Sequence, residues 1–165
     1  MRLERSGFRV MGKNENVYFE ARKEASRWDD RLGSRETAAS MLGISPYSLA
    51  DYELGNTKVV PVDKVVLMAD LYKAPELKTW YCKHECPIGR NLPLATEQKG
   101  LEGIALRLIG GLEDAKEIQR GLIEIAQDGK VSADERVAWN KIIGQLNSLS
   151  EVISEIRLYA EKVET

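Results

Sequence analysis

The segment from Ser34 to Gly55 constrains the fold most, because it carries start and stop signals for two short helices in immediate succession. Ser34 can cap the first helix, and Gly43 suits the positive φ at which a helix ends. Ser45 can cap the second helix, whose first position is then Pro46, where the missing N–H costs nothing. Two short helices joined by such a turn form a helix-turn-helix, whose second helix can enter the major groove of DNA.

The side chains of this segment are expected to divide between an inner and an outer face. Small alanines in the first helix would let another helix approach closely. In the second helix, Tyr47, Ser48 and Asp51 are expected to face outward. The residues expected to face inward are Ala38, Ala39, Leu42, Leu49 and Tyr52.

At these positions the chain resembles the Xre/Cro-like family of phage and bacterial repressors. The resemblance covers about residues 16–78 and continues through 62–72, where the family has a closing helix. It implies an all-α domain of four or five short helices over 16–79. It also implies a sequence-specific transcriptional regulator from a phage or other mobile element of a bacterium, with double-stranded DNA as its partner. The residues that carry the resemblance are Ser34, Glu36, Ala39, Leu42, Gly43, Ile44, Ser45, Leu49, Tyr52, Glu53, Gly55 and Pro61.

The resemblance implies that the second helix reads base edges and that the flanking residues contact phosphate. No cation stands at the exposed positions of this helix, although Asp51 can accept a hydrogen bond from cytosine N4. Arg35 matches a family position that contacts phosphate, and the loop after the helix ends in Lys58. The candidate DNA-binding residues are Arg35, Ser45, Pro46, Tyr47, Ser48, Asp51, Asn56, Thr57 and Lys58.

The charge of the chain argues against a general polyanion binder. Its net charge is −2 and its pI is near 5.6, and between residues 13 and 73 nine cations face ten acids. A strong nonspecific DNA binder would carry a basic excess, because phosphate contacts dominate its affinity. The alternative hypothesis is therefore a protein-binding adaptor or inhibitor that keeps the helix-turn-helix fold without reading DNA.

The first 33 residues give two further expectations. Residues 1–15 are predicted to be a flexible basic arm that could enter a minor groove; the alternatives are a disordered tail, or an extended gene start with Met11 as the natural first residue. A first helix beginning near Asn16 is predicted to be prolonged until Gly33, with Trp28 and Leu32 packing back on the domain.

No apolar run approaches a membrane span, and the start of the chain lacks the apolar core of a signal peptide, so a cytoplasmic location is expected.

Residues 80–94 are predicted to be a hinge, made rigid by Pro87 and Pro93. The hinge holds both cysteines and the only histidine of the chain, as Cys82, His84 and Cys86. A structural zinc needs four ligands, so a complete site would require a second chain. A disulfide across so short a loop would be strained. Packing of the thiols as small hydrophobes is favoured, with a metal site and redox chemistry as alternatives.

Residues 95–165 predict a long antiparallel α-helical hairpin. Apolar residues recur at steps of three and four from Leu101 and again from Trp139, which is typical of a coiled-coil seam. Apolar residues beside the seams would stay partly exposed until a second hairpin covered them in a four-helix bundle, so a homodimer is predicted. The expected dimerisation residues are Leu108, Ile118, Leu122, Ile125, Trp139, Ile142, Leu146, Leu149, Ile153 and Ile156. The flanking residues are Leu106, Ile109, Leu112, Ile123, Ile143 and Leu158.

No enzyme is predicted. The chain has no glycine-rich phosphate loop, and no nucleophile can be paired with its single histidine. The carboxylates fall mostly on faces expected to be solvated. No cofactor is expected, and no residue is assigned a catalytic role.

Overall fold

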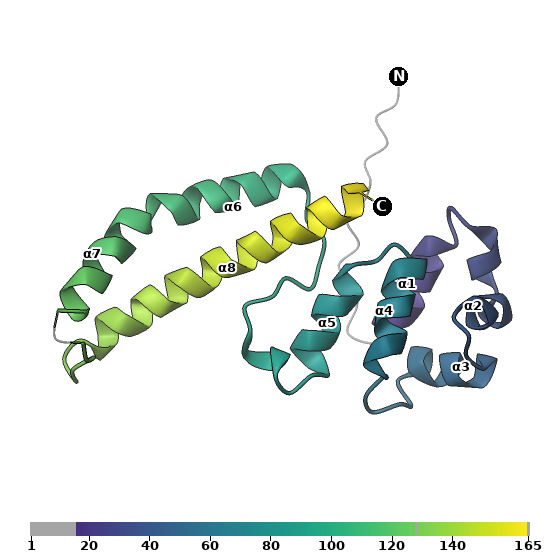
Figure 1. Cartoon of the computed structure of the whole chain (residues 1–165). Helices are drawn as coiled ribbons and strands as arrows, with labels where there is room; N and C mark the ends of the chain where they lie inside the picture. The colour runs from purple at the N-terminus through teal and green to yellow at the C-terminus, as the bar shows by residue number, and fades with distance from the viewer. Residues whose placement is uncertain (1–15, 128, 165) are drawn as a thin grey trace, which may run out of the picture. The chain divides into compact units, whose positions relative to one another are not determined.

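A computed structural model of the chain describes residues 16–127 and 129–164 (Figure 1). Within these residues every regular element is helical, which confirms the all-α prediction. The chain forms two compact units, one ending at Val60 and the other beginning at Pro61. The first predicted domain, 16–79, therefore has residues in both units, and the predicted arm, 1–15, lies outside the described residues. No helix in the described part of the chain has the length and apolar character needed to cross a membrane.

The first unit begins with α1, Val17–Ala25. Asn16 caps α1, because its side-chain oxygen accepts hydrogen bonds from the backbone N–H groups of Tyr18 at 2.9 Å and Phe19 at 3.3 Å. The same amide donates to the carbonyl of Tyr52 at 2.8 Å, which joins the start of α1 to α3.

The prediction of a prolonged first helix is wrong. After Ala25 the chain turns, and a separate 3-10 helix, η1, covers Asp30–Gly33. Asp29 breaks the helix because its extended backbone lets its carboxylate cap η1, accepting from the N–H of Arg31 at 3.1 Å. Leu32 is fully buried as expected, but Trp28 is exposed rather than packed back.

The next two helices are α2, Arg35–Met41, and α3, Pro46–Leu54. Ser34 accepts from the N–H of Thr37 and Ser45 from that of Ser48, so both predicted caps are confirmed. The turn between the helices contains Gly43 at φ 64°, as predicted, and α3 ends in Gly55 at φ 73°. Contacts of α3 with both α1 and α2 close the first unit.

The second unit begins with α4, Val62–Leu71, and α5, Glu76–His84, which pack on each other. A short 3-10 helix, η2 (Gly89–Asn91), then folds back on α5. Gly89 allows this return, since a β-carbon at that position would collide with the backbone carbonyl of Cys82.

The second unit continues with α6, Leu101–Glu113, α7, Ala115–Ile125, and α8, Arg136–Glu164. Both α6 and α7 pack along α8, which runs back beside them in Figure 1. The buried cluster between α7 and α8 consists of Ile118, Ile125 and Ile142. Asp114 interrupts the first predicted arm, so two helices stand where one continuous helix was expected.

The predicted seam of α8 holds near Ile142 but fails towards the C-terminus. There the buried residues are Val152, Glu155 and Leu158, whereas Ile153 is exposed. A straight α-helix drifts by about 20° per heptad against a 3.5-residue repeat, so the inward face moves away from a strict heptad seam. Leu158, expected to be partly exposed, is therefore buried.

The connection between α5 and α6 is fastened to α8 at two neighbouring points. The backbone N–H of Ala95 donates to the hydroxyl of Ser154 at 3.0 Å, and the ammonium of Lys99 lies 2.6 Å from Oε1 of Glu155. Glu155 is buried, and its Oε1 also accepts from Arg107 of α6. One carboxylate thus holds both the connection and α6 to α8.

Candidate nucleic-acid interface

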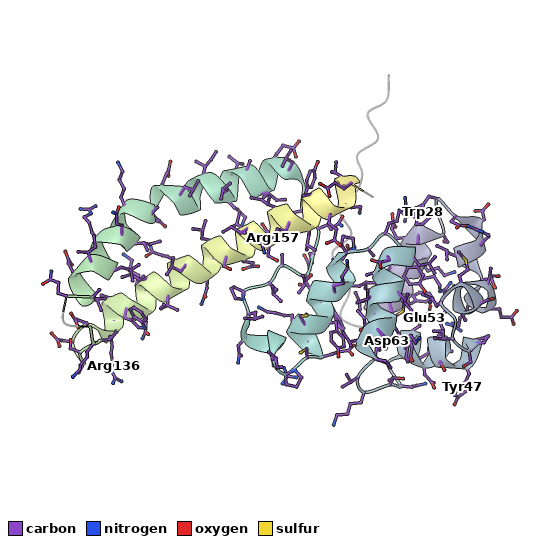
Figure 2. All side chains as sticks on the ribbon, in the orientation of Figure 1. Trp28, Tyr47, Glu53, Asp63, Arg136 and Arg157 are labelled. Atoms are coloured by element: carbon purple, nitrogen blue, oxygen red, sulfur yellow. The ribbon has the colours of Figure 1, made fainter. Side chains whose placement is uncertain are left out.

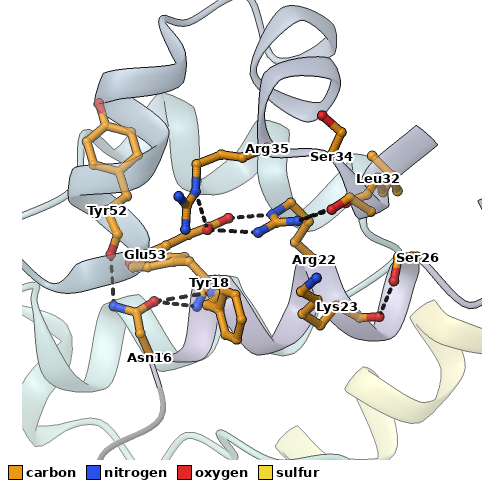
Figure 3. A network of polar contacts seen from close by, with 12 residues as sticks. Asn16, Tyr18, Arg22, Lys23, Ser26, Leu32, Ser34, Arg35, Tyr52 and Glu53 are labelled. Atoms are coloured by element: carbon orange, nitrogen blue, oxygen red, sulfur yellow. Dashed lines mark hydrogen bonds and ion pairs between the residues drawn. The ribbon is translucent and has the colours of Figure 1, made fainter. Parts of the chain in front are cut away.

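A buried ion pair fixes α3 within the first unit (Figure 3). Arg22 of α1 donates through Nε to Oε1 of Glu53 at 2.5 Å, and through Nη2 to Oε2 at 2.9 Å. The remaining Nη1 donates to the carbonyls of Leu32 at 3.0 Å and Gly33 at 3.2 Å. The guanidinium therefore binds η1 and α3 at the same time, and its charge is compensated although water does not reach it.

Arg35 extends this network to α2. Its Nε donates to Oε2 of Glu53 at 2.9 Å, and about a third of its side chain is exposed. Within the described residues Arg35 has no other polar partner, so its two Nη groups remain available to a ligand. The predicted phosphate-contacting residue is therefore also a structural residue of the α2–α3 contact.

The start of α3 presents Tyr47 to solvent. Its side chain is 77% exposed and points away from the ribbon in Figure 2. Pro46 beside it is exposed, as is Ser45. The hydroxyls of Ser45 and Ser48 lie 2.8 Å apart, and Ser48 is only half exposed. The two serines thus satisfy each other at the helix cap, and Tyr47 is the most accessible large side chain for a ligand.

The end of α3 presents an acid and an amide bonded to each other. The side-chain amide of Asn56 donates to the carboxylate of Asp51 at 3.1 Å, and the backbone N–H of Asn56 donates to the Asp51 carbonyl at 2.9 Å. Thr57 is half-buried and Lys58 is exposed. The predicted site residues other than Arg35 thus belong to α3, to its cap Ser45 and to the loop that follows it.

The electrostatics of this surface are close to neutral. α3 contains Asp51 and Glu53 and no cation, and these two acids balance the charges of Arg22 and Arg35, both of which pair with Glu53. Lys58 contributes one exposed positive charge. Such a surface would attract phosphate weakly and would depend on base contacts or on a second copy for affinity.

Sequence reasoning assigned no role to Arg22 and Glu53. A signal for both was present: Arg22 stands four residues after Tyr18 on the inner face of α1, and Glu53 four residues after Leu49 on the inner face of α3. A charged residue at an inward position needs a partner of opposite charge. Which partner it finds depends on tertiary contacts that the helical pattern does not contain.

The candidate metal ligands lie on and after α5. Cys82 and Cys86 are free thiols, both half-buried. The ring of His84 stacks on Trp80 at 4.6 Å, and its Nδ1 lies 2.9 Å from the Trp80 carbonyl. In residues 16–127 and 129–164 no three side chains of the metal-binding types form a possible site. The imidazole of His84 thus makes its stacking and polar contacts with Trp80, one turn earlier in α5.

The predicted dimerisation residues lie mostly between α7 and α8 of a single chain. Ile118, Ile125 and Ile142 are buried there, and Leu122, Trp139 and Leu146 pack against them. Three others are half-buried, namely Leu108, Leu149 and Ile156, and Ile153 is exposed. Most of these side chains therefore hold one copy together and have little surface left for a second.

No family model, curated protein or solved structure matches this chain. The resemblance at residues 16–78 to Xre/Cro-like repressors accordingly stays a prediction.

Proposed function

We propose that the chain is a sequence-specific DNA-binding transcriptional regulator similar to Xre/Cro-like repressors, with α2 and α3 as its helix-turn-helix. The supporting observation is the buried network of Arg22, Glu53 and Arg35, which ties α3 to α1, η1 and α2. Burying charge is costly, and a retained ion pair often serves to specify one arrangement rather than to add stability. A helix that reads bases needs such fixing, because its side chains must meet base edges within fractions of an ångström.

The proposed contacts combine the resemblance with exposure, since Tyr47 and Lys58 are exposed and Asp51 is half-buried. Tyr47 and Asp51 would meet base edges in the major groove, and Lys58 and the free Nη groups of Arg35 would contact phosphates. Asp51 would then have to exchange its hydrogen bond with Asn56 for one with a base.

The regulator would act as a homodimer. Operators of helix-turn-helix dimers repeat at about 34 Å, one turn of DNA, because each copy uses one face of the duplex. The helices α6–α8 would form the predicted hairpin and supply the contact between copies. The resemblance further suggests a phage or other mobile element of a bacterium as the source, and the cytoplasm as the place of action.

A second candidate function is that of a protein-binding adaptor or inhibitor with the same fold. It is favoured by one observation: α3 contains no cation, while Tyr47 and Leu54 leave apolar surface exposed on it. A protein groove would tolerate this surface better than a phosphate backbone would.

Selection of genomic fragments by the purified full-length protein tests the proposal. We expect enrichment of one motif with two-fold symmetry and half-sites one turn apart. Tyr47→Ala serves as the control variant, because the residue is exposed and its loss should change the motif without unfolding the protein. Equal fragment recovery with the wild type, the variant and an empty matrix would contradict the proposal and favour the adaptor.

A further inference from the structure

Two cations lie together where η2 folds back on the end of α5. The ammonium of Lys83, in the last turn of α5, donates to the backbone carbonyl of Leu92 at 2.9 Å. The guanidinium of Arg90, in η2, donates in the opposite direction, through Nη2 to the backbone carbonyl of His84 at 3.4 Å. Each cation is held by the stretch of chain that carries the other. Lys83 and Arg90 therefore form one surface, which we call the α5–η2 basic surface.

The backbone brings these two cations together for a steric reason. The return of η2 requires Gly89, because a β-carbon there would lie 2.3 Å from the carbonyl oxygen of Cys82. Gly89 is buried and directly precedes Arg90. This close approach of the two segments therefore fixes where the backbone of Arg90 lies relative to α5.

Acids of the described chain do not neutralise the α5–η2 basic surface. Within residues 16–127 and 129–164, the polar contacts of Lys83 and Arg90 are with backbone carbonyls, and neither side chain forms an ion pair. In the sequence, Glu85 is the only acid between residues 79 and 96. It stands two residues after Lys83, and side chains with that spacing do not face each other on a helix. The surface thus keeps two positive charges in a chain whose net charge is −2.

Both cations also keep hydrogen-bond donors for a ligand. An ammonium has three N–H donors and a guanidinium has five, and the contacts with Leu92 and His84 use one of each. His84 adds no donor: a carbonyl only accepts, so Nδ1 carries the hydrogen in the contact with Trp80, and the other nitrogen of the neutral ring is an acceptor. An anion with several acceptor oxygens, such as a phosphate group, matches this set of donors.

We infer that the α5–η2 basic surface binds phosphates of the DNA backbone, as a contact outside the helix-turn-helix. The inference goes beyond the proposed function and rests on it only in taking DNA as the partner. α3 contains no cation, and the proposed phosphate contacts beside it are limited to Lys58 and Arg35, so a reading helix of this kind needs further phosphate contacts. Duplex DNA carries one negative charge per about 1.7 Å of its axis, so it offers phosphates to more than one surface of a protein.

Two phosphate contacts would have a measurable effect on affinity. The logarithm of the binding constant falls with the logarithm of the salt concentration, with a slope of about −0.9 for each phosphate contacted. Loss of both cations should make this salt slope shallower by about 1.8. At about 0.1 M salt, binding should weaken about tenfold for each lost contact. The loss should be the same on every DNA sequence, because a phosphate carries no sequence information.

The test measures binding of the full-length protein to a labelled duplex of random sequence between about 50 and 200 mM salt, the range over which such contacts are resolved. The neutral variant, Lys83→Gln with Arg90→Gln, removes both charges and should show the loss of affinity and of slope. Lys116→Gln with Arg136→Gln is the matched control, because it removes one lysine and one arginine at exposed positions of α7 and α8. A neutral variant that binds as well as this control overturns the inference.

A third variant separates the loss of charge from damage to the fold. Lys83→Arg with Arg90→Lys keeps both charges while exchanging the side chains that bond Leu92 and His84, so it should retain the salt slope of the wild type. If it loses the slope as fully as the neutral variant, the inference is overturned, because charge is then not the property that binds DNA. Inorganic phosphate, added at constant ionic strength, should not displace the duplex. Displacement would assign the surface to a free phosphate ion and overturn the inference.

The outcomes distinguish the inference from the proposed function. If the wild type selects one sequence motif and the neutral variant has the wild-type slope, the inference fails and the proposed function stands. If the neutral variant loses the slope and the wild type selects no motif, the inference stands and sequence reading fails. A wild type that binds no duplex at low salt overturns both.

Discussion

Arg22 and Glu53 are 31 positions apart in the sequence, yet their side chains meet in two hydrogen bonds of 2.5 and 2.9 Å with almost no access to water. The pair lies where α1, η1 and α3 converge, and Arg35 joins it from α2. A polar contact between an arginine and a glutamate therefore occupies a position where an apolar core would be the usual choice.

Removing one member of this pair should be far more costly than replacing both. We expect Glu53→Ala to lower the free energy of unfolding by about 3–5 kcal/mol, because it leaves the buried guanidinium of Arg22 without the carboxylate that compensates its charge. Arg22→Met combined with Glu53→Met should cost much less. Urea unfolding of the purified variants measures both values. Glu36→Ala, at an exposed position of α2, is the control and should stay within about 0.5 kcal/mol of wild type. A Glu53→Ala cost below about 1 kcal/mol would show that the network does not hold α3.

Lys58 should contribute to DNA binding through phosphate alone. We expect Lys58→Ala to weaken binding equally on all sequences and to reduce the salt dependence of the binding constant by about one unit, since one phosphate contact is lost. Lys116→Ala removes the same charge from an exposed position of α7 and should change neither. Arg35→Ala should lower both DNA affinity and stability, because Arg35 also bonds Glu53. If the binding constants of wild type and Lys58→Ala depend equally on salt concentration, Lys58 does not contact the DNA.

Tyr47 and Asp51 should determine which sequence is preferred. Replacing Tyr47 by alanine should cost about 1–3 kcal/mol on the best site and little on random DNA. Asp51→Asn should raise nonspecific retention, because a negative charge near phosphate is removed, while discrimination between sites falls. Ser48→Ala is the comparison variant, since the Ser48 hydroxyl is already bonded to Ser45. Binding of labelled duplexes in low salt gives all three values, and unchanged preference in both the Tyr47 and Asp51 variants would favour the adaptor.

Glu76 should make stability depend on pH with an unusual sign. Burial raises the pKa of this carboxyl above its ordinary value, although the side chain of Gln98 donates to it at 3.0 Å. The folded state then binds the proton more tightly than the unfolded state, so stability falls as pH rises through the ordinary and raised pKa values. Glu76→Gln should therefore be more stable than wild type at pH 7, with the difference shrinking as pH falls below the ordinary pKa.

Glu117 should make stability depend on pH with the opposite sign to Glu76. A hydrogen bond from Lys141 lowers the pKa of Glu117, so its small contribution to stability is present above the ordinary pKa and lost as pH falls through the lowered one. Glu117→Gln should be slightly less stable than wild type at pH 7. Thermal unfolding of both variants between pH 3 and 7 checks the two signs, and a Glu76→Gln protein less stable than wild type at pH 7 would refute the first.

The two thiols should be reduced and free of metal. Cys82 and Cys86 should both react with a thiol reagent in the denatured protein, and elemental analysis should find less than one zinc per chain. We also expect a chelator to leave the melting temperature unchanged, because chelation lowers stability only where a bound metal supports the fold. Zinc held at one per chain or one per dimer would instead assign Cys82, His84 and Cys86 to a site completed by a second copy.

Local signals account for what the sequence predicted well. The caps at Ser34 and Ser45 and the positive φ of Gly43 depend only on residues within one turn of each helix, so a linear pattern contains them. The end of α1 was missed because the helical pattern of residues 22–33 does not reveal that Asp29 would cap a new 3-10 helix.

Non-local contacts account for the features that could not be predicted from the sequence. The apolar spacing identified the helices of the second half, but the heptad assignment predicted Ile153 inside and missed Val152 and Glu155. Glu155 is buried because Lys99 and Arg107 arrive from other segments. In the candidate site, the exposure of Tyr47 followed from helical periodicity. The ion pair of Arg35 with Glu53 could not be predicted in this way, because it joins two helices that meet only in the folded unit.

The fastening of Ala95 to Ser154 and of Lys99 to Glu155 limits the slack between α5 and α6. A loose tether lets two linked binding modules reach sites at many separations, at the cost of a low effective concentration at each. A connection held against a long helix is rigid, so its length does not fluctuate as the length of a flexible coil does. Within the second unit, the segment from Ala95 to Lys99 therefore keeps one path along α8, and the spacing between the end of α5 and the start of α6 is set by these two contacts.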